Sequence, residues 1–174
     1  MANRQPASLS AERIYSELKK NGVTHVVMLP DSETNFLYTL LRSDPSLTVL
    51  HMAREGQSFS TAAGLFVGGK RPVVLIQNTG LLESCDSLRG WGMTLKVPLV
   101  VMVGYRGWTR HGVNSPTDVA RFTEPVITAL GLQYYLVESD ADAERISLAF
   151  KDAEQTRRPV IVLVGDEYHG FVNR

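Results

Sequence analysis

The stretch Pro72-Val73-Val74-Leu75-Ile76-Gln77-Asn78-Thr79-Gly80 decides the fold class. Its apolar residues are consecutive and do not alternate with polar ones, which indicates a strand covered by protein on both faces. Strands of this kind are typical of parallel sheets flanked by helices. The polar and glycine residues at 78–80 then end the strand. The stretch therefore predicts an interior strand of an α/β sheet.

The rest of the chain alternates apolar runs with segments of helical periodicity. Strands are predicted over residues 23–29, 47–51, 72–77, 98–103, 133–137 and 159–164. Helices are predicted over residues 11–21, 35–41, 55–67, 81–95, a segment ending near 131, and 141–156, with a surface loop over 104–117. This order predicts one doubly wound α/β domain over residues 1–174, with a six-stranded, mainly parallel sheet and helices on both faces.

Composition excludes several classes of protein. The 174 residues are 44% hydrophobic, and 18 basic residues balance 18 acidic ones, so no global charge favours nucleic acid or an anionic membrane. A single cysteine, Cys85, rules out an internal disulfide framework and fits a reducing compartment. Without a signal-peptide core or a membrane-length apolar run, we expect a stand-alone cytoplasmic subunit. Motifs for dinucleotides, nucleotide triphosphates and serine hydrolysis are absent, and the four histidines lack metal-ligand spacing.

Glu55 is the leading candidate for a functional acid. It lies where the apolar segment ending at His51 gives way to a helix rich in small residues. Ligands of open α/β sheets bind in crevices at the carboxyl ends of strands. Burial there disfavours the charged form of a carboxyl group, so we expect Glu55 to hold or share a proton near neutral pH. The alternative is an ordinary first-turn glutamate that faces water and is stabilised by the helix dipole.

Three segments follow the first three predicted strands and should meet at one edge of the sheet. They are Leu29-Pro30-Asp31-Ser32, Arg54-Glu55-Gly56-Gln57 and Gln77-Asn78-Thr79-Gly80-Leu81. With Ala62-Ala63-Gly64, they resemble the pyrimidine-binding half of thiamine diphosphate enzymes. The group they resemble most contains sulfopyruvate decarboxylase and phosphonopyruvate decarboxylase. The resemblance extends from about residue 14 to residue 164.

The resemblance implies a role for each matching residue. Glu55 would be catalytic and would contact N1′ of the cofactor pyrimidine, and Pro30 would line that ring. Asn78 would bind the cofactor and, with Asp31 and Ser32, face the substrate. The reaction implied is decarboxylation of a 2-oxo acid to an aldehyde and CO2. Apart from the resemblance, residues 30–32 fit an ordinary turn with a helix cap, and Asn78 fits a capped helix start.

The same resemblance implies a partner subunit. Enzymes of this class hold the diphosphate and its Mg²⁺ with a Gly-Asp-Gly motif and a later asparagine. The nearest match here is Gly165-Asp166-Glu167, which reads as a plain strand-end turn. We therefore expect a hetero-oligomer in which a second subunit holds the diphosphate and Mg²⁺, with no metal ligand in this chain.

The substrate expected is a small anionic 2-oxo acid. Sulfopyruvate and phosphonopyruvate both carry an anionic head, and Arg106 in the loop 104–117 could bind it, with Arg110 and His111 nearby. A solvated loop with scattered charge is the alternative.

Two competing functions remain open from the sequence. The chain could be the pyrimidine half of an acyloin-forming or oxidative thiamine diphosphate enzyme. It could also be a non-catalytic, flavodoxin-like binding module. The order of the three strand-end segments argues against the second.

Overall fold

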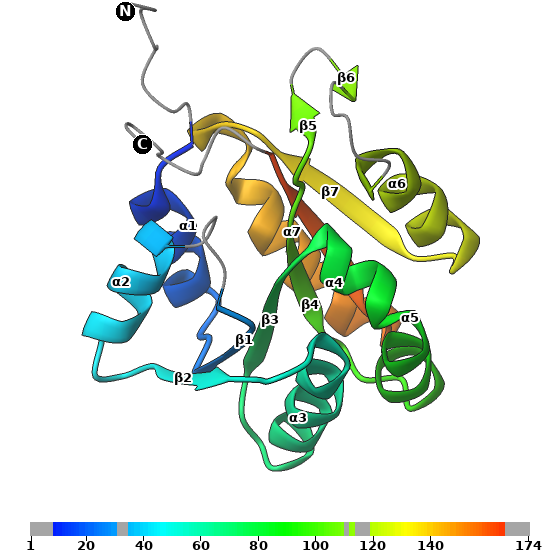
Figure 1. Ribbon diagram of the computed structural model, residues 1–174. Coiled ribbons are helices and arrows are strands. Elements are labelled where there is room, and N and C mark those ends of the chain that lie inside the picture. Colours follow the sequence, from blue (N-terminus) through cyan, green and yellow to red (C-terminus); the bar gives the residue numbers. More distant parts are fainter. Residues whose placement is uncertain (1–8, 31–34, 110–111, 114–118, 166–174) are drawn as a thin grey trace, which may run out of the picture.

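The computed structural model describes residues 9–30, 35–109, 112–113 and 119–165, and the description below concerns those residues (Figure 1). Six parallel strands form one sheet in the order β2-β1-β3-β4-β8-β7. Their bounds are β1 His25–Met28, β2 Thr48–His51, β3 Pro72–Gln77, β4 Val100–Gly104, β7 Gln133–Val137 and β8 Val160–Val164. The predicted α/β class with a six-stranded sheet is confirmed, and every neighbouring pair of strands is parallel.

Helices cover both faces of this sheet (Figure 1). One face packs against α1 Ala11–Lys20, α2 Asn35–Ser43 and α7 Glu144–Thr156. The other packs against α3 Glu55–Val67, α4 Asn78–Glu83, the π-helix η1 Leu88–Thr94 and α6 Val119–Ala129. The short α5 Cys85–Ser87 and the 3-10 helix η2 Asp140–Asp142 complete the helices of the described residues.

The unbroken apolar runs of the strands follow from these two layers. Along β3, Val73 and Leu75 are buried against the first group of helices, whereas Val74 and Ile76 are buried against the second. Neighbouring side chains of a strand point to opposite faces, so both sets must be apolar when both faces are covered. The absence of alternation in the sequence is thus a direct result of burial on two sides.

The strand order creates a switch point between β1 and β3. From β1 the chain moves outward to the edge strand β2, and α3 then carries it back across β1 to β3. The register pairs Met28 with both His51 and Leu75, so the segments that follow these three strands leave the sheet at the same edge. Ligand crevices in doubly wound sheets form at such a point. The fold therefore brings together the three segments singled out in the sequence.

The segment after β3 differs from the single helix predicted over residues 81–95. The helix already begins at Asn78, and the Ser84 hydroxyl bonds back to the carbonyl of Gly80 at 2.6 Å, where α4 ends. A π-helix follows, in which a Cβ at Gly92 would lie 2.5 Å from Cγ of Pro159. This close approach to the start of β8 explains why glycine occupies position 92, and local periodicity does not reveal it.

The predicted surface loop over 104–117 was wrong in part, because it contains a small antiparallel hairpin. Its strands are β5 Trp108–Thr109 and β6 Gly112–Val113, with Trp108 paired to Val113. Strands of two residues are too short to leave a periodic pattern in a sequence.

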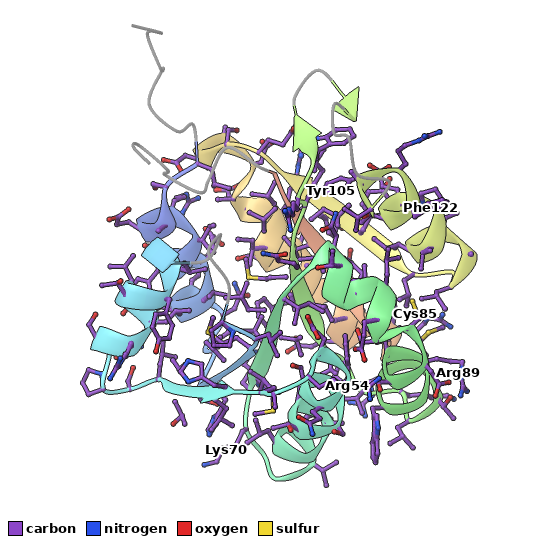
Figure 2. All side chains as sticks on the ribbon, in the orientation of Figure 1. Arg54, Lys70, Cys85, Arg89, Tyr105 and Phe122 are labelled. Carbon is purple, nitrogen blue, oxygen red and sulfur yellow. The ribbon has the colours of Figure 1, made fainter. Side chains whose placement is uncertain are left out.

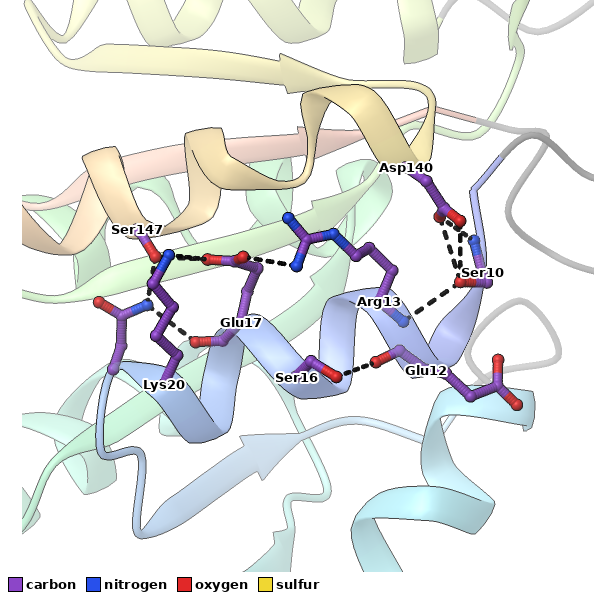
Figure 3. A network of polar contacts seen from close by, with 9 residues as sticks. Ser10, Glu12, Arg13, Ser16, Glu17, Lys20, Asp140 and Ser147 are labelled. Carbon is purple, nitrogen blue, oxygen red and sulfur yellow. Dashed lines mark hydrogen bonds and ion pairs between the residues drawn. The ribbon is translucent and has the colours of Figure 1, made fainter.

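A buried acid joins α1 to α7 on the face away from α3 (Figure 3). The side chain of Glu17 is only 1% exposed, and its carboxylate pairs with Arg13 at 2.8 Å and Lys20 at 3.6 Å. It also accepts a hydrogen bond from the Ser147 hydroxyl of α7. A buried charge costs free energy unless it is paired and hydrogen-bonded. Both oxygens of Glu17 are paired with cations, and Oε2 is also hydrogen-bonded, whereas Oε1 is not.

Glu17→Ala should therefore lower the free energy of unfolding by about 2 kcal/mol, since it removes charged hydrogen bonds and leaves a cavity. Urea denaturation of the chain measures this. Glu12→Ala is the matched control on the same helix, because Glu12 is exposed, and it should cost under about 1 kcal/mol. Equal, small losses in the two variants would contradict the stabilising role of Glu17.

Candidate active site

Glu55 opens α3 and rests against the start of α4. Its side chain is half-buried, and a Cβ built on Gly80 would lie 2.3 Å from Cγ and 2.8 Å from Oε1 of Glu55. Only a glycine at position 80 leaves room for this contact. The carboxyl group is thereby held at the carboxyl edge of the sheet, beside the helix that follows β3.

The Glu55 carboxyl group makes no hydrogen bond or ion pair with any of the described residues. The N–H of Gly56, in the same helical turn, is bonded instead by Oε2 of Glu83 at 3.2 Å. Glu83 also pairs with the Arg54 guanidinium, which Figure 2 shows beside the start of α3. A half-buried acid at a strand end, without a partner among the residues that the structure describes, is chemically available to a ligand.

Asn78 lies at the same edge, and its side chain is completely buried. Its amide nitrogen donates to the carbonyl of Arg106 at 2.9 Å and to the Thr123 hydroxyl at 3.2 Å. Its amide oxygen accepts from the N–H of Thr79 at 3.1 Å. Asn78 thus ties the end of β3 to the loop after β4 and to α6. Its direct contact with cofactor or substrate stays a prediction.

The other predicted site residues are placed as follows. Pro30 is exposed, two residues after the end of β1. Asp31 and Ser32 lie outside the described residues, as do Arg110 and His111. Arg106 is exposed and is fixed through its carbonyl by Asn78. The fold therefore brings the predicted strand ends to one edge and joins two of them by a hydrogen bond.

Sequence reasoning missed an aromatic and acidic cluster behind Arg106. The Tyr105 hydroxyl donates to one oxygen of Glu124 at 3.0 Å, and the Tyr134 hydroxyl donates to the other at 2.6 Å. The Tyr105 ring stacks on Trp108 with centroids 4.9 Å apart, and Trp108 Nε1 donates to Glu138. The only signal in the sequence is that two aromatic residues follow β4.

The two phenols of this cluster remain neutral donors at physiological pH. Burial, and then the hydrogen bond to Glu124, raises the pKa of Tyr105 well above its ordinary value. The hydrogen bond to Glu124, reinforced by burial, raises the pKa of Tyr134 to about 12. Both hydroxyls therefore keep their bonds to Glu124, and these bonds hold the loop that carries Arg106.

Among the described residues, no metal cluster lies at Glu55, and the cavity described next is distant from it. Among residues 9–30, 35–109, 112–113 and 119–165, no group of three His, Cys, Asp or Glu side chains could hold a metal ion. A cavity of about 340 Å³ lies at the opposite, amino edge of the sheet, where it is lined by Lys70, Arg71 and Glu154. Figure 2 shows Lys70 at the other end of the molecule from Tyr105. Arg71 is already paired there with Glu154 at 2.6 Å.

No helix in the part of the chain that the structure describes has the length and apolarity needed to cross a membrane.

The curated relatives of the chain carry two enzyme names. The sulfopyruvate decarboxylase subunit alpha of Methanothermobacter thermautotrophicus is 26% identical over 160 residues, covering 91% of this chain and 97% of that protein. A sulfopyruvate decarboxylase of Methanosarcina acetivorans is 25% identical over 154 residues, covering 88% of this chain. A phosphonopyruvate decarboxylase of Streptomyces hygroscopicus is 30% identical over 140 residues, covering 79% of this chain. The chain spans only 39% and 34% of these last two proteins.

Solved structures confirm the fold. Benzoylformate decarboxylase from Polynucleobacter necessarius superposes with a TM-score of 0.71 at 19% identity, over 98% of this chain and 32% of that one. A protein of Mycobacterium smegmatis described as a thiamin diphosphate-dependent enzyme gives a TM-score of 0.62 at 22% identity, over 94% of this chain and 31% of its own length. No family model matches the chain. The resemblance inferred from the strand-end segments is confirmed by the curated relatives.

Gly80→Ala should destabilise the chain by about 1–3 kcal/mol, because the added methyl group would collide with the middle of the Glu55 side chain. Chemical denaturation measures the loss. Gly64→Ala in α3 is the matched control, since nothing lies within 4 Å of its Cβ, and it should instead stabilise by up to about 1 kcal/mol.

Adding Glu55→Ala to Gly80→Ala removes the collision and should recover most of the loss. If Gly80→Ala costs no more than Gly64→Ala, the close contact between Glu55 and position 80 does not exist.

Proposed function

We propose, from its similarity to sulfopyruvate decarboxylase alpha subunits along nearly its whole length, that this chain is the pyrimidine-binding subunit of a thiamine diphosphate-dependent 2-oxo acid decarboxylase. The observation that carries the proposal is the half-buried carboxyl group of Glu55. It rests on Gly80 at the carboxyl edge of the sheet and has no partner among the described residues. Such a group suits proton exchange with a ring nitrogen.

The residues present fit the pyrimidine end of that cofactor. The bare backbone at Gly80 leaves the Glu55 carboxyl group room at the edge, where it would hold a proton at N1′ of the ring. Pro30 would line the ring, and Asn78 would fix the wall formed by the β4 loop. When bound, thiamine diphosphate supplies the electron sink for loss of CO2. This chain contributes orientation and proton transfer at one nitrogen.

A second subunit would hold the diphosphate and its Mg²⁺. Two kinds of relative support this division. In one, a protein named subunit alpha is matched over 97% of its length, and the name implies at least one other subunit. In the other, a longer decarboxylase is matched over only 39% of its length. The rest of that single chain is long enough to include a part that binds the diphosphate. The active site would then lie between this chain and its partner.

The substrate would be a small 2-oxo acid with an anionic head. The relatives are named for sulfopyruvate and phosphonopyruvate. Arg106 is exposed at the edge that carries Glu55, on a backbone fixed by Asn78. A planar guanidinium group matches the oxygens of a sulfonate or phosphonate. Asp31 and Ser32 remain candidates for substrate contact by the same resemblance.

Glu55→Gln should lower turnover at least about 100-fold, because the amide cannot exchange a proton with the ring nitrogen. The measurement is CO2 release from 3-sulfopyruvate by the complex recovered from native cells on the tagged chain, with thiamine diphosphate and Mg²⁺ supplied. Asp86→Asn, at an exposed carboxylate paired with Arg89, is the control and should keep full activity. The tagged chain alone should show no turnover. Near-normal turnover by the Gln variant would overturn the role of Glu55.

Arg106→Ala should raise KM for 3-sulfopyruvate about 10- to 100-fold, the range expected when a charged hydrogen bond is lost. Turnover of pyruvate, which has no anionic head, should change little. Arg89→Ala serves as the control, since Arg89 is an exposed arginine paired with Asp86. Equal losses on both substrates would exclude Arg106 as the residue that recognises the head group.

A further inference from the structure

The first turn of α3 lacks the cap that helices usually carry. Its N-cap residue is Arg54, whose backbone is extended (φ −152°, ψ 139°) and whose side chain makes no capping hydrogen bond. Helix starts usually place Ser, Thr, Asp or Asn here, because their side-chain oxygen accepts a bond from a free backbone N–H. A cation at this end is also opposed by the positive pole of the helix. Something else must therefore satisfy the start of α3.

Glu83 of α4 supplies the missing cap from 27 residues away. One oxygen of its carboxylate accepts the hydrogen bond of the Gly56 N–H at 3.2 Å. The other pairs with Nε of Arg54. A single acid thus satisfies a free backbone donor, places negative charge at the helix start and neutralises the arginine.

Two glycines, Gly56 and Gly80, allow the close packing of α3 against α4 and α5 that makes this reach possible. A Cβ at Gly56 would lie 2.9 Å from Oγ of Ser87, just as one at Gly80 would strike Glu55. Gly80 and Glu83 are three residues apart and so lie on the same face of α4. That face therefore meets the first turn of α3 twice, once at Glu55 and once at Gly56.

We propose that Glu83 is the positioning residue of the site: it caps α3 so that Glu55 does not have to. A first-turn glutamate ordinarily serves the helix start itself. Here Glu83 holds that place, and the Glu55 carboxyl group is left without a partner among the described residues. Glu83 is then a cap supplied by a neighbouring helix. Its bonds to Gly56 and Arg54 fix the backbone from which Glu55 projects. The catalytic consequence rests on the proposed function, whereas the division of roles between the two acids does not.

The division of roles can be tested on the chain alone by NMR. The chemical shift of an amide proton depends on whether it is bonded to a charged carboxylate. The Gly56 amide proton should therefore move when the charge of its acceptor is removed in Glu83→Gln, and should stay in place in Glu55→Gln. The reverse result would show that Glu55 is the cap, and the inference would be wrong.

The catalytic consequence is tested in the assembled enzyme. Glu83→Ala should lower kcat about 10-fold, within the cost of a misplaced catalytic group, while Glu83→Gln, whose amide oxygen can still accept from Gly56, should recover most of it. Asp86→Ala is the matched control, because it removes an arginine-paired carboxylate three residues along the same segment and should leave kcat unchanged.

A double-mutant cycle separates positioning from general damage. If Glu83 acts through Glu55, Glu83→Ala should cause no further loss in a Glu55→Gln background. Additive losses, or failure of Glu83→Gln to recover kcat, would refute the positioning role. An inactive wild-type complex would instead count against the proposed function and leave the NMR result standing.

Discussion

The site depends on one steric constraint, the contact of the Glu55 side chain with the bare backbone of Gly80. It exists because α3 crosses from the edge strand β2 back over β1, which brings its first turn against the helix that follows β3. Any side chain at position 80 would occupy the place of the carboxyl group. The crossing of α3 over β1 sets the position of Glu55, and Gly80 leaves room for its carboxyl group there.

The sheet and the polar contacts around its carboxyl edge hold Glu55 and Gly80 in place. Strands buried on both faces leave little freedom to the segments that follow them. Asn78 then fixes the loop after β4, and the hydroxyls of Tyr105 and Tyr134 hold Glu124 beneath it. Residues around the edge thus hold one another, and Glu55, which has no partner among the described residues, lies within this ordered frame.

Much of this could be predicted from the sequence, and the rest could not for definite reasons. Continuous apolar runs revealed the six strands, and the helix at 55–67 has the bounds predicted because its small and aromatic residues recur at helical spacing. The π-helix at 88–94 was missed, since local periodicity does not reveal the close approach of Gly92 to the distant Pro159. Glu55 was predicted as a site residue from its place at a strand end, and that role stays a prediction. Glu83 was not predicted, because its role depends on a hydrogen bond across 27 residues.

The charges at this edge of the sheet favour the proposed division of the cofactor between two subunits. Two acids lie at the first turn of α3: Glu55 belongs to that turn, and Glu83 of α4 bonds to Gly56 and pairs with the nearby cation Arg54. When Glu55 is ionised, the three side chains carry one negative charge in excess, which would repel a diphosphate but not a neutral, nitrogen-bearing ring. The edge that we propose to exchange a proton would therefore be poorly suited to hold the anionic end of the same cofactor. Binding the two ends with different subunits would let each surface carry the charge that its own end requires.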